Sequence, residues 1–257
     1  MNLFLKKLFF GFTQFFFNPF KPLNNWRALP FFIKNLYVYN TTKPITSFKI
    51  SFKDIYYTSG DRYSSSGSVK HHYFHQDLWA ARYLFRQGVK EHVDVGSRVD
   101  GFVLAALSFT SINYVDIRPL ECEIPGLSFI QGSILNLPFV DESVSSLSCL
   151  HVLEHIGLGR YGDEVMPDGH IRGAKELQRI LAKGGTLLFS TPVGQQKICF
   201  DAHRIFSPFT ILEIFNELNL LDFYLIGDEA NGIIQNASME DALNCSYGCG
   251  LFVFIKK

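Results

Sequence analysis

The stretch Leu137-Pro-Phe-Val-Asp-Glu-Ser-Val-Ser-Ser-Leu-Ser-Cys-Leu-His-Val-Leu-Glu-His-Ile156 decides how this chain of 257 residues folds. An acidic turn leads into an apolar run at 144–150, and polar side chains follow at His151, Glu154 and His155. A short apolar run bounded by turn residues is typical of a strand buried in a sheet. The stretch therefore predicts a buried strand with reactive side chains at its carboxyl end.

Strands and helices alternate regularly around this strand. The apolar pattern predicts strands at 92–95, 112–117, 127–131, 144–150, 186–190, 219–226 and 251–255, and helices at 77–85, 101–108 and 174–181. Asp77 is the expected N-cap of the first helix, and Gly184-Gly185 are expected to close the third. Strands alternating with helices form parallel, doubly wound sheets with right-handed crossovers, so we expect an α/β fold.

The net charge of zero is the sum of two parts of the chain that differ in their numbers of basic and acidic side chains. Residues 1–53 carry eight basic side chains and no acidic one, whereas residues 54–257 hold 16 basic and 24 acidic side chains. We therefore divide the chain into a basic aromatic segment at 1–53, a linker at 54–74 and a domain at 75–257. No nucleic-acid partner is expected, because binding phosphates needs a basic face and the larger part is acidic.

Leucine and phenylalanine crowd residues 1–20, and on a helical wheel most of them share one arc. Lys6, Lys7 and Pro19 argue against a membrane-spanning helix, and no small-residue cleavage site indicates a secretory signal. Two interpretations remain. The segment forms an amphipathic helix in the interface of an anionic membrane, or it packs against protein.

Prolines and small residues near the end of this segment and after it predict where helices end and where a loop lies. Pro19, Pro22 and Pro30 predict that any helix ends near residue 18. Loose alternation at 48–56 predicts a strand, and the run of serine and glycine at 64–68 predicts a loop.

The five cysteines stand at positions 122, 149, 199, 245 and 249. Cys149 and Cys199 lie in or beside apolar runs, where a free thiol acts as a small hydrophobic group. Cys245 and Cys249 have neither CxxC spacing nor a matching His/Cys pair, so the sequence predicts no metal site. A reducing cytoplasm fits this cysteine usage.

Four segments together resemble the class I S-adenosylmethionine-dependent methyltransferases: 93–97, 114–117, 137–156 and 181–189. The resemblance covers 75–257 and implies a mostly parallel, seven-stranded Rossmann-like sheet that ends in an antiparallel C-terminal hairpin. It also implies S-adenosylmethionine as the cofactor. In finer detail the chain resembles an uncharacterised bacterial methyltransferase-like family, which is often associated with surface-polysaccharide genes.

The turn after the first strand corresponds to the glycine-rich turn of these enzymes, where the backbone approaches the ligand. The resemblance assigns Asp94, Gly96, Ser97 and Gly101 to the cofactor. The sequence departs from the family pattern, because Gly96-Ser97 is followed by Arg-Val-Asp rather than by further glycines. A tight turn without a cofactor is the alternative.

Further cofactor residues follow the second, third and fourth strands. Asp116 ends the second strand, where an acid can accept both ribose hydroxyl hydrogens; a helix cap or surface acid is the alternative. The resemblance places Ile117 against the adenine face. Many relatives have Asp where Ser133 stands, and this Asp binds the adenine amino group. In this chain the resemblance implies that backbone groups of Ser133 and Ile134 bind the adenine edge instead. His151 falls near the methionyl end, or is a satisfied strand-end histidine.

A polar, glycine-rich loop at 157–169 leaves the carboxyl end of the fourth strand, the edge at which ligands bind in such sheets. Arg160 suits a phosphate or carboxylate, and we expect it to hold the acceptor together with Tyr161 and Asp163. A solvated loop in which Arg160 and Asp163 pair locally is the alternative.

A hydroxyl acceptor must lose its proton, and His155 is the first candidate for the base, with His203 second. His155 anchoring the loop is the alternative. We expect a cytoplasmic enzyme, peripheral on the inner face of the membrane, that O-methylates a glycan or lipid-linked saccharide. The competing function is a noncatalytic adenosyl-ligand-binding or scaffold protein of a membrane assembly, which the altered glycine turn and the missing acid at Ser133 favour.

Overall fold

The computed structural model describes residues 21–42, 50–51, 55–57, 61–63, 66–67, 69–121 and 123–257. The chain divides into two compact units, residues 1–68 and 69–257, each of which is considered by itself. The amphipathic helix expected within residues 1–20 lies outside the described residues.

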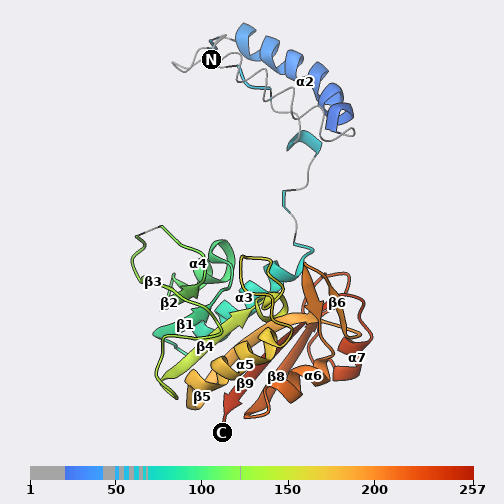
Figure 1. Ribbon diagram of the computed structural model, residues 1–257. Helices are drawn as coiled ribbons and strands as arrows, with labels where there is room; N and C mark the ends of the chain where they lie inside the picture. The colour runs from blue at the N-terminus through green and yellow to red at the C-terminus, as the bar shows by residue number, and fades with distance from the viewer. Residues whose placement is uncertain are drawn as a thin grey trace. The chain divides into compact units, whose positions relative to one another are not determined.

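In the first unit, helix α2 spans Lys21–Thr41 (Figure 1). The sequence did not predict this helix, and the expected helix end near residue 18 lies outside the described residues. Pro22 lies in the first turn, where backbone N–H groups have no helical partner, so its missing N–H costs nothing. Pro30 lies inside the helix and removes one backbone hydrogen bond, which the remaining turns of this 21-residue helix outweigh.

Aromatic contacts tie α2 to the residues that follow it within the first unit. The Arg62 guanidinium lies 3.8 Å from the ring centroid of Phe31, and the rings of Phe32 and Tyr57 are 5.0 Å apart. Arg62 belongs to the short 3-10 helix η2 at Asp61–Tyr63. The described residues of the strand expected at 48–56 are not in a strand. Within the described part of the chain, no helix is both long and apolar enough to cross a membrane.

The second unit is built on a seven-stranded sheet in the order β3-β2-β1-β4-β5-β9-β8. The strands are β1 Glu91–Val95, β2 Ser111–Asp116, β3 Leu127–Gln131, β4 Val144–Leu150, β5 Leu181–Val193, β8 Leu218–Ile226 and β9 Gly248–Lys256. β1 to β5 pair in parallel, and β9 is antiparallel to both β5 and β8. This arrangement confirms the predicted α/β sheet with an antiparallel C-terminal hairpin.

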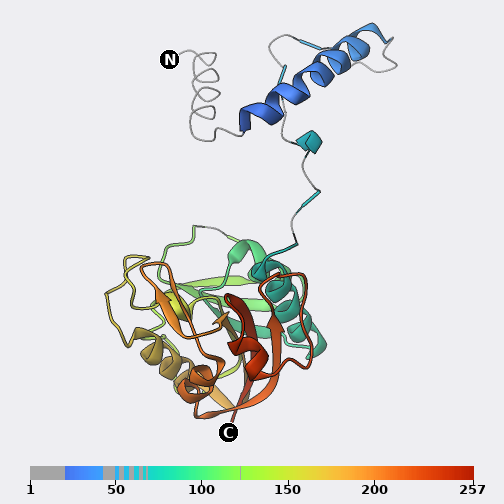
Figure 2. The ribbon, with the colours of Figure 1, turned by 90° about the vertical axis from the view of Figure 1, so that its right-hand side faces the viewer.

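Helices cover both faces of the sheet (Figures 1 and 2). Buried residues of α3 (His72–Arg86), the π-helix η3 (Val99–Val103) and α4 (Leu104–Ala106) form one core cluster with side chains of the sheet. Those of α5 (Gly169–Ile180), α6 (Pro208–Ile214) and α7 (Met239–Leu243) form a second. The two clusters make a doubly wound, three-layer domain.

Two helix ends differ from the sequence prediction. α3 begins at His72, because the His71 Nδ1 accepts a hydrogen bond from the Phe74 N–H at 3.1 Å and serves as the N-cap. Asp77 is therefore not the cap but a buried residue inside the helix. α5 ends at Ile180 rather than at the glycine pair, and β5 starts at once.

The glycine pair instead lies in an irregular part of β5. The ladder with β4 shifts register between the pairs Val144–Leu181 and Ser146–Thr186, and Gly184 in this shift has a φ of 71°. The sequence reading also missed the hairpin of β6 (Lys197–Cys199) and β7 (His203–Ile205), as well as α6 and α7.

Candidate functional site

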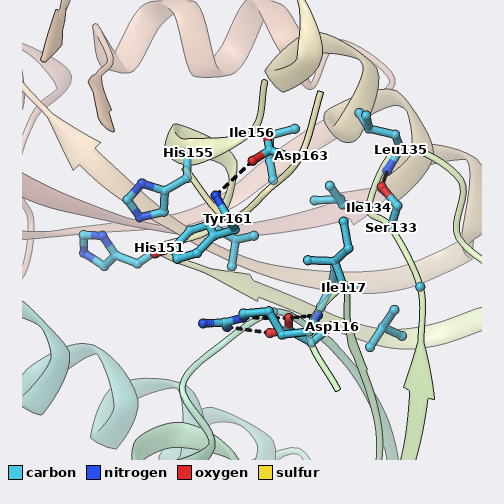
Figure 3. A pocket seen from close by; sticks show the side chains of 16 residues that line it. Asp116, Ile117, Ser133, Ile134, Leu135, His151, His155, Ile156, Tyr161 and Asp163 are labelled. Atoms are coloured by element: carbon cyan, nitrogen blue, oxygen red, sulfur yellow. Dashed lines mark hydrogen bonds and ion pairs between the residues drawn. The ribbon is translucent and has the colours of Figure 1, made fainter. Parts of the chain in front are cut away.

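A pocket opens at the carboxyl ends of β1 to β4, where the strand order reverses between β1 and β4. In doubly wound sheets ligands bind at this switch point. The empty space of the pocket measures about 650 Å³, which includes its open mouth. Its walls come from the four strand ends and from the loop after β4 (Figure 3).

Gly96 forms the first wall. It has a φ of 73°, and a Cβ there would lie 3.1 Å from both methyl groups of Val152. Glycine is therefore needed both for the backbone conformation and for the close approach to the fourth-strand loop. Its N–H donates to the Val115 carbonyl at 2.8 Å, which ties the end of β1 to the end of β2.

Asp94 lies behind this wall and is fully buried. Its carboxylate accepts hydrogen bonds from the Ser97 N–H at 3.0 Å, the Ser97 hydroxyl at 2.6 Å and the Ser148 hydroxyl. Burial raises the pKa of Asp94 to about 6, although these hydrogen bonds oppose the shift. Asp94 and Ser97 therefore brace the turn and do not line the pocket.

Gly101 also lies outside the pocket lining. A Cβ at this position would come within 2.0 Å of an Asp77 carboxylate oxygen, so the glycine allows η3 to pack closely on α3. Three of the four residues assigned to the cofactor around this turn thus support its shape rather than face the pocket.

Asp116 does line the pocket, at the end of β2. Arg118 binds both of its oxygens, from Nε at 2.9 Å and from Nη2 at 2.7 Å, and the Arg118 backbone N–H adds a bond of 2.8 Å. The Tyr114 hydroxyl donates to it as well, at 2.9 Å. Burial acts to raise the pKa of Asp116, but the hydrogen bonds, led by those from Arg118, outweigh burial and hold this pKa below its usual value.

Ile117, Ser133 and Ile134 line the same end of the pocket as Asp116, away from the two histidines (Figure 3). The Ser133 hydroxyl accepts a hydrogen bond from the Leu135 N–H at 3.2 Å, so it shapes its own turn. This end combines apolar side chains with a few backbone polar groups, as small-molecule pockets usually do.

His151 lies at the opposite end of the pocket (Figure 3). Its φ of 55° is rare for a residue with a side chain, and such strained positions cluster at functional sites. Its Nδ1 lies 2.7 Å from an oxygen of the buried Glu154 carboxylate. Burial acts to lower the pKa of His151, but Cys249 and Glu154 raise it by more, so the net shift is well upward.

Glu154 shows the reciprocal behaviour. Burial acts to raise its pKa, but attraction to His151 dominates and the net shift is downward. The two side chains therefore form a buried, hydrogen-bonded pair. His72 stacks on His151 with ring centroids 5.7 Å apart, and burial lowers the pKa of His72 to about 4.

The loop after β4 contributes His155, Tyr161 and Asp163 to the pocket. The His155 Nδ1 lies 2.7 Å from the Ala202 carbonyl and 3.3 Å from the Arg160 guanidinium. It cannot donate to the first and accept from the second at once, and the shorter contact selects the Nδ1–H tautomer. In neutral His155 the lone pair is then on Nε2.

Contacts within the loop fix its shape. The Asp163 carboxylate accepts from the Gly157 N–H at 2.8 Å and from the Tyr161 N–H at 3.2 Å. Arg160 is exposed and donates to the Ala202 carbonyl at 2.8 Å rather than pairing with Asp163. Arg160 does not line the pocket, and its guanidinium lies 5.2 Å from the Tyr161 ring centroid.

His203 is half-buried and packs on Tyr247 at a ring-centroid distance of 5.2 Å, outside the pocket lining. Burial lowers its pKa. Its neighbour Arg204 is buried and donates to the Ile156 carbonyl at 2.7 Å, so Arg204 supports the loop from behind.

The structure thus brings nine of the predicted site residues into one pocket: Gly96, Asp116, Ile117, Ser133, Ile134, His151, His155, Tyr161 and Asp163. Asp94, Ser97, Gly101, Arg160 and His203 lie outside its lining. Arg118 was missed, although it stands two residues after Asp116 in the sequence. Glu154 was not assigned a role, and His72 had no sequence signal because it meets His151 only through the fold.

Residues 140–249 match the family described as Caenorhabditis protein of unknown function, DUF268. The description names Caenorhabditis, so it does not support the bacterial family expected from the sequence. No curated protein matches this chain.

Several solved structures are similar to the chain. The cyclase SpnF has a TM-score of 0.52 and 13% identity, covering 74% of this chain and 85% of SpnF. N-methyltransferase NodS from Bradyrhizobium japonicum WM9 has a TM-score of 0.50 and 14% identity, covering 70% of this chain and 94% of NodS.

A third similar structure contains a ligand. 1,6-Didemethyltoxoflavin-N1-methyltransferase from Burkholderia thailandensis, with bound 1,6-didemethyltoxoflavin and S-adenosylhomocysteine, has a TM-score of 0.50 and 13% identity, covering 71% of this chain and 78% of that enzyme. At these identities the similarities establish the fold, which is the Rossmann-like methyltransferase fold.

Proposed function

We propose that this protein is an S-adenosylmethionine-dependent methyltransferase. The observation that carries the proposal is the switch-point pocket, which has the Gly96 turn and the acid Asp116 on neighbouring strand ends. The similar enzyme from Burkholderia thailandensis binds S-adenosylhomocysteine on the same fold, which supports this ligand class.

The residues of the pocket fit an adenosyl ligand in most respects. Gly96 keeps the turn in its positive-φ conformation against Val152, which also lines the pocket. Ile117 and Ile134 would hold the adenine, and Asp116 would accept the ribose hydroxyls once Arg118 releases it. S-adenosylmethionine, when bound, supplies a methyl group on a positively charged sulfur.

His155 is the proposed base. Its Nδ1–H donates to the Ala202 carbonyl, which orients the ring and leaves Nε2 to take the proton of an acceptor hydroxyl. Tyr161 and Asp163 line the same pocket and would border the acceptor, and Arg160 stands at the exposed side of the loop. His203 lies outside the pocket lining and is the weaker candidate.

The acceptor we propose is a hydroxyl of a glycan or lipid-linked saccharide. The polar loop and the proposed base His155 suit such an acceptor. We further propose that residues 1–20 attach the enzyme to an anionic membrane on its cytoplasmic side, because this segment combines lysines with many phenylalanines and the first 53 residues contain no acid.

One observation favours the noncatalytic alternative, an adenosyl-binding or scaffold protein. Arg118 occupies both oxygens of the acid that should receive the ribose. SpnF, a cyclase with a similar fold, also illustrates that this fold alone does not assign methyl transfer.

Calorimetric titration of the full-length protein with S-adenosylmethionine and S-adenosylhomocysteine tests the proposal, with adenosine and methionine as matched controls. We expect saturable binding of both adenosyl ligands at one site per chain. Folded protein that binds neither at millimolar concentration would contradict the methyltransferase and any adenosyl-binding function, and would leave the scaffold. Binding without transfer to any hydroxyl acceptor in a saccharide panel would favour the noncatalytic function.

A further inference from the structure

Three buried side chains from distant parts of the sequence meet beside the pocket. His72 is the first residue of α3, His151 follows β4, and Cys249 lies in β9. One donor atom from each lies within 4.8 Å of the other two. His72 and His151 are each 8% exposed and Cys249 is fully buried, so water competes little for these donors.

Two imidazoles and a thiolate are a ligand set that suits zinc. Zn²⁺ binds nitrogen at about 2.0–2.1 Å and sulfur at about 2.3 Å, usually in tetrahedral geometry. Donors around such an ion lie roughly 3.3–3.8 Å apart. The three donor atoms lie within 4.8 Å of one another, so they would have to approach by at most about 1.0–1.5 Å, which rotations of the side chains supply.

His151 gives an independent indication of a ligand. Its Nε2 is buried, and among the described residues the Cys249 thiol of the same cluster is its only polar partner. Its Nδ1, by contrast, is held by the Glu154 carboxylate at 2.7 Å. A histidine that binds a metal through one nitrogen almost always donates a hydrogen bond to a carboxylate or carbonyl through the other.

His72 has comparable support. It makes a hydrogen bond with the backbone of Tyr247, and its ring stacks on the Tyr247 ring with centroids 5.1 Å apart. Both histidines are therefore oriented by neighbours that are not themselves ligands, as in metal sites.

We propose that His72, His151 and Cys249 form a binding site for Zn²⁺. The three residues leave a fourth coordination position for water or a small ligand. Since His151 also lines the switch-point pocket, the ion would lie at the pocket edge. The spacing of Cys245 and Cys249 predicted no metal site, because ligands that come from three separate elements leave no local pattern in the sequence. This site does not depend on methyl transfer.

The test uses untagged, full-length, reduced protein that has been stripped with a chelator. Zn²⁺ affinity is measured by competition with a coloured chelator, and Co²⁺ serves as an optical probe, because a cobalt–thiolate bond produces a charge-transfer band. We expect one Zn²⁺ per chain and a cobalt–thiolate band. Cys249→Ala should abolish the band and weaken Zn²⁺ binding by more than the roughly 10–100-fold that the loss of an outer-shell partner causes.

Cys199→Ala is the matched control, because Cys199 is a partly exposed thiol outside the cluster. It should bind both ions as the native protein does. His72→Gln provides a second ligand variant with the thiol intact, in case Cys249→Ala fails to fold. Circular dichroism and the metal-free thermal midpoint report the folding of each variant.

Zn²⁺ should also raise the thermal midpoint of the native protein and of Cys199→Ala, since a ligand that binds only the folded state stabilises it. Zn²⁺ should raise the thermal midpoint of Cys249→Ala and of His72→Gln far less. Native protein without the cobalt–thiolate band would overturn the proposal, as would equal Zn²⁺ affinity in the native protein and a folded ligand variant. These measurements need no adenosyl ligand, so they are independent of the proposed methyltransferase activity.

Discussion

Arg118 covers Asp116: the guanidinium binds both carboxylate oxygens, at 2.9 and 2.7 Å, from a position on the rim of the pocket. The Arg118 side chain is 55% exposed and its guanidinium also lies 4.9 Å from the Tyr161 ring centroid. A ribose that binds Asp116 must compete with this contact. The pair therefore links access to the adenosyl site with the loop after β4.

Replacing Asp116 should weaken adenosyl binding. Asp116→Ala removes charge-assisted hydrogen bonds worth about 1.5–3 kcal/mol each, so we expect the affinity for S-adenosylhomocysteine to fall at least tenfold. The ligand-free thermal midpoint should change little, because the partner Arg118 is half-exposed and remains solvated. Calorimetry and thermal melts measure the two quantities. Unchanged affinity in the folded variant would remove Asp116 from the site.

Replacing Arg118 should have the opposite effect on binding. Arg118→Ala frees both oxygens of Asp116, and we expect the affinity for S-adenosylhomocysteine to rise severalfold, since an exposed ion pair is worth only about 1 kcal/mol. Arg98→Ala is a suitable control, because Arg98 pairs with the exposed Asp100 instead. Weaker binding in Arg118→Ala would mean that the guanidinium contacts the ligand rather than competing with it.

Asp94 should make the stability of the protein depend on pH in a defined window. Burial raises its folded-state pKa from 3.8 to about 6, so the folded state holds this proton more tightly than the unfolded state. The stabilisation is present below about pH 4 and is lost as the pH rises towards 6, with a total on the order of 2–3 kcal/mol.

Asp94→Asn should remove this pH dependence, because its amide does not titrate. Urea unfolding of both proteins between pH 4 and 7 measures the difference in the free energy of unfolding. If the free energy of unfolding changes with pH in the same way in both proteins, Asp94 is not the source of the pH dependence.

The membrane proposal predicts that full-length protein floats with vesicles that contain anionic lipid. Lys6→Glu with Lys7→Glu should reduce flotation, and raising the salt concentration should reduce it only in part, because the burial of phenylalanine is not screened. A chain that starts at Asp54 should stay unbound. If the full-length protein does not float with the vesicles, residues 1–20 belong to a protein interface instead.

The sequence predicted the sheet because a buried parallel strand is an apolar run, and the runs at 127–131 and 144–150 have the observed bounds. It predicted Asp116 and His151 because a residue at a strand end faces the switch point whatever the rest of the fold does. The sequence did not predict two of the side-chain contacts. Arg118 stands two residues after Asp116, but its contact with the carboxylate depends on the direction of the side chain. The meeting of His72 with Cys249 depends on packing between distant elements, which no local spacing encodes.

Asp94 shows that a residue in a motif does not always contact the ligand. Its place in the motif suggested contact with the cofactor, yet its side chain points back to Ser97 and Ser148 and is fully buried. Similarly, Gly101 is required by its closeness to Asp77 and not by a ligand. A motif residue can be needed for the shape of a turn rather than for contact with a ligand.

The base should be identifiable by comparing His155 with His203. His155 lines the pocket and has its lone pair on Nε2, which lies 3.8 Å from the Glu154 carboxylate, whereas His203 lies outside the lining. Once an acceptor is found, His155→Ala should lower the methyl-transfer rate by about 10²–10⁴-fold while retaining affinity for S-adenosylhomocysteine. His203→Ala should lower it much less.

A structural role for His155 would also slow the enzyme, so the rate alone does not decide between the two. The Nδ1 bond to the Ala202 carbonyl ties the loop to the β6–β7 hairpin, and its loss should lower the thermal midpoint. His155→Asn is therefore the sharper variant, because its amide can keep a donor near that carbonyl but cannot accept a proton from a hydroxyl. A pH–rate profile completes the test, since a basic histidine makes the native rate fall with acidity and the asparagine variant should lack that limb. Near-native turnover in His155→Asn would show that positioning of the acceptor suffices without this base.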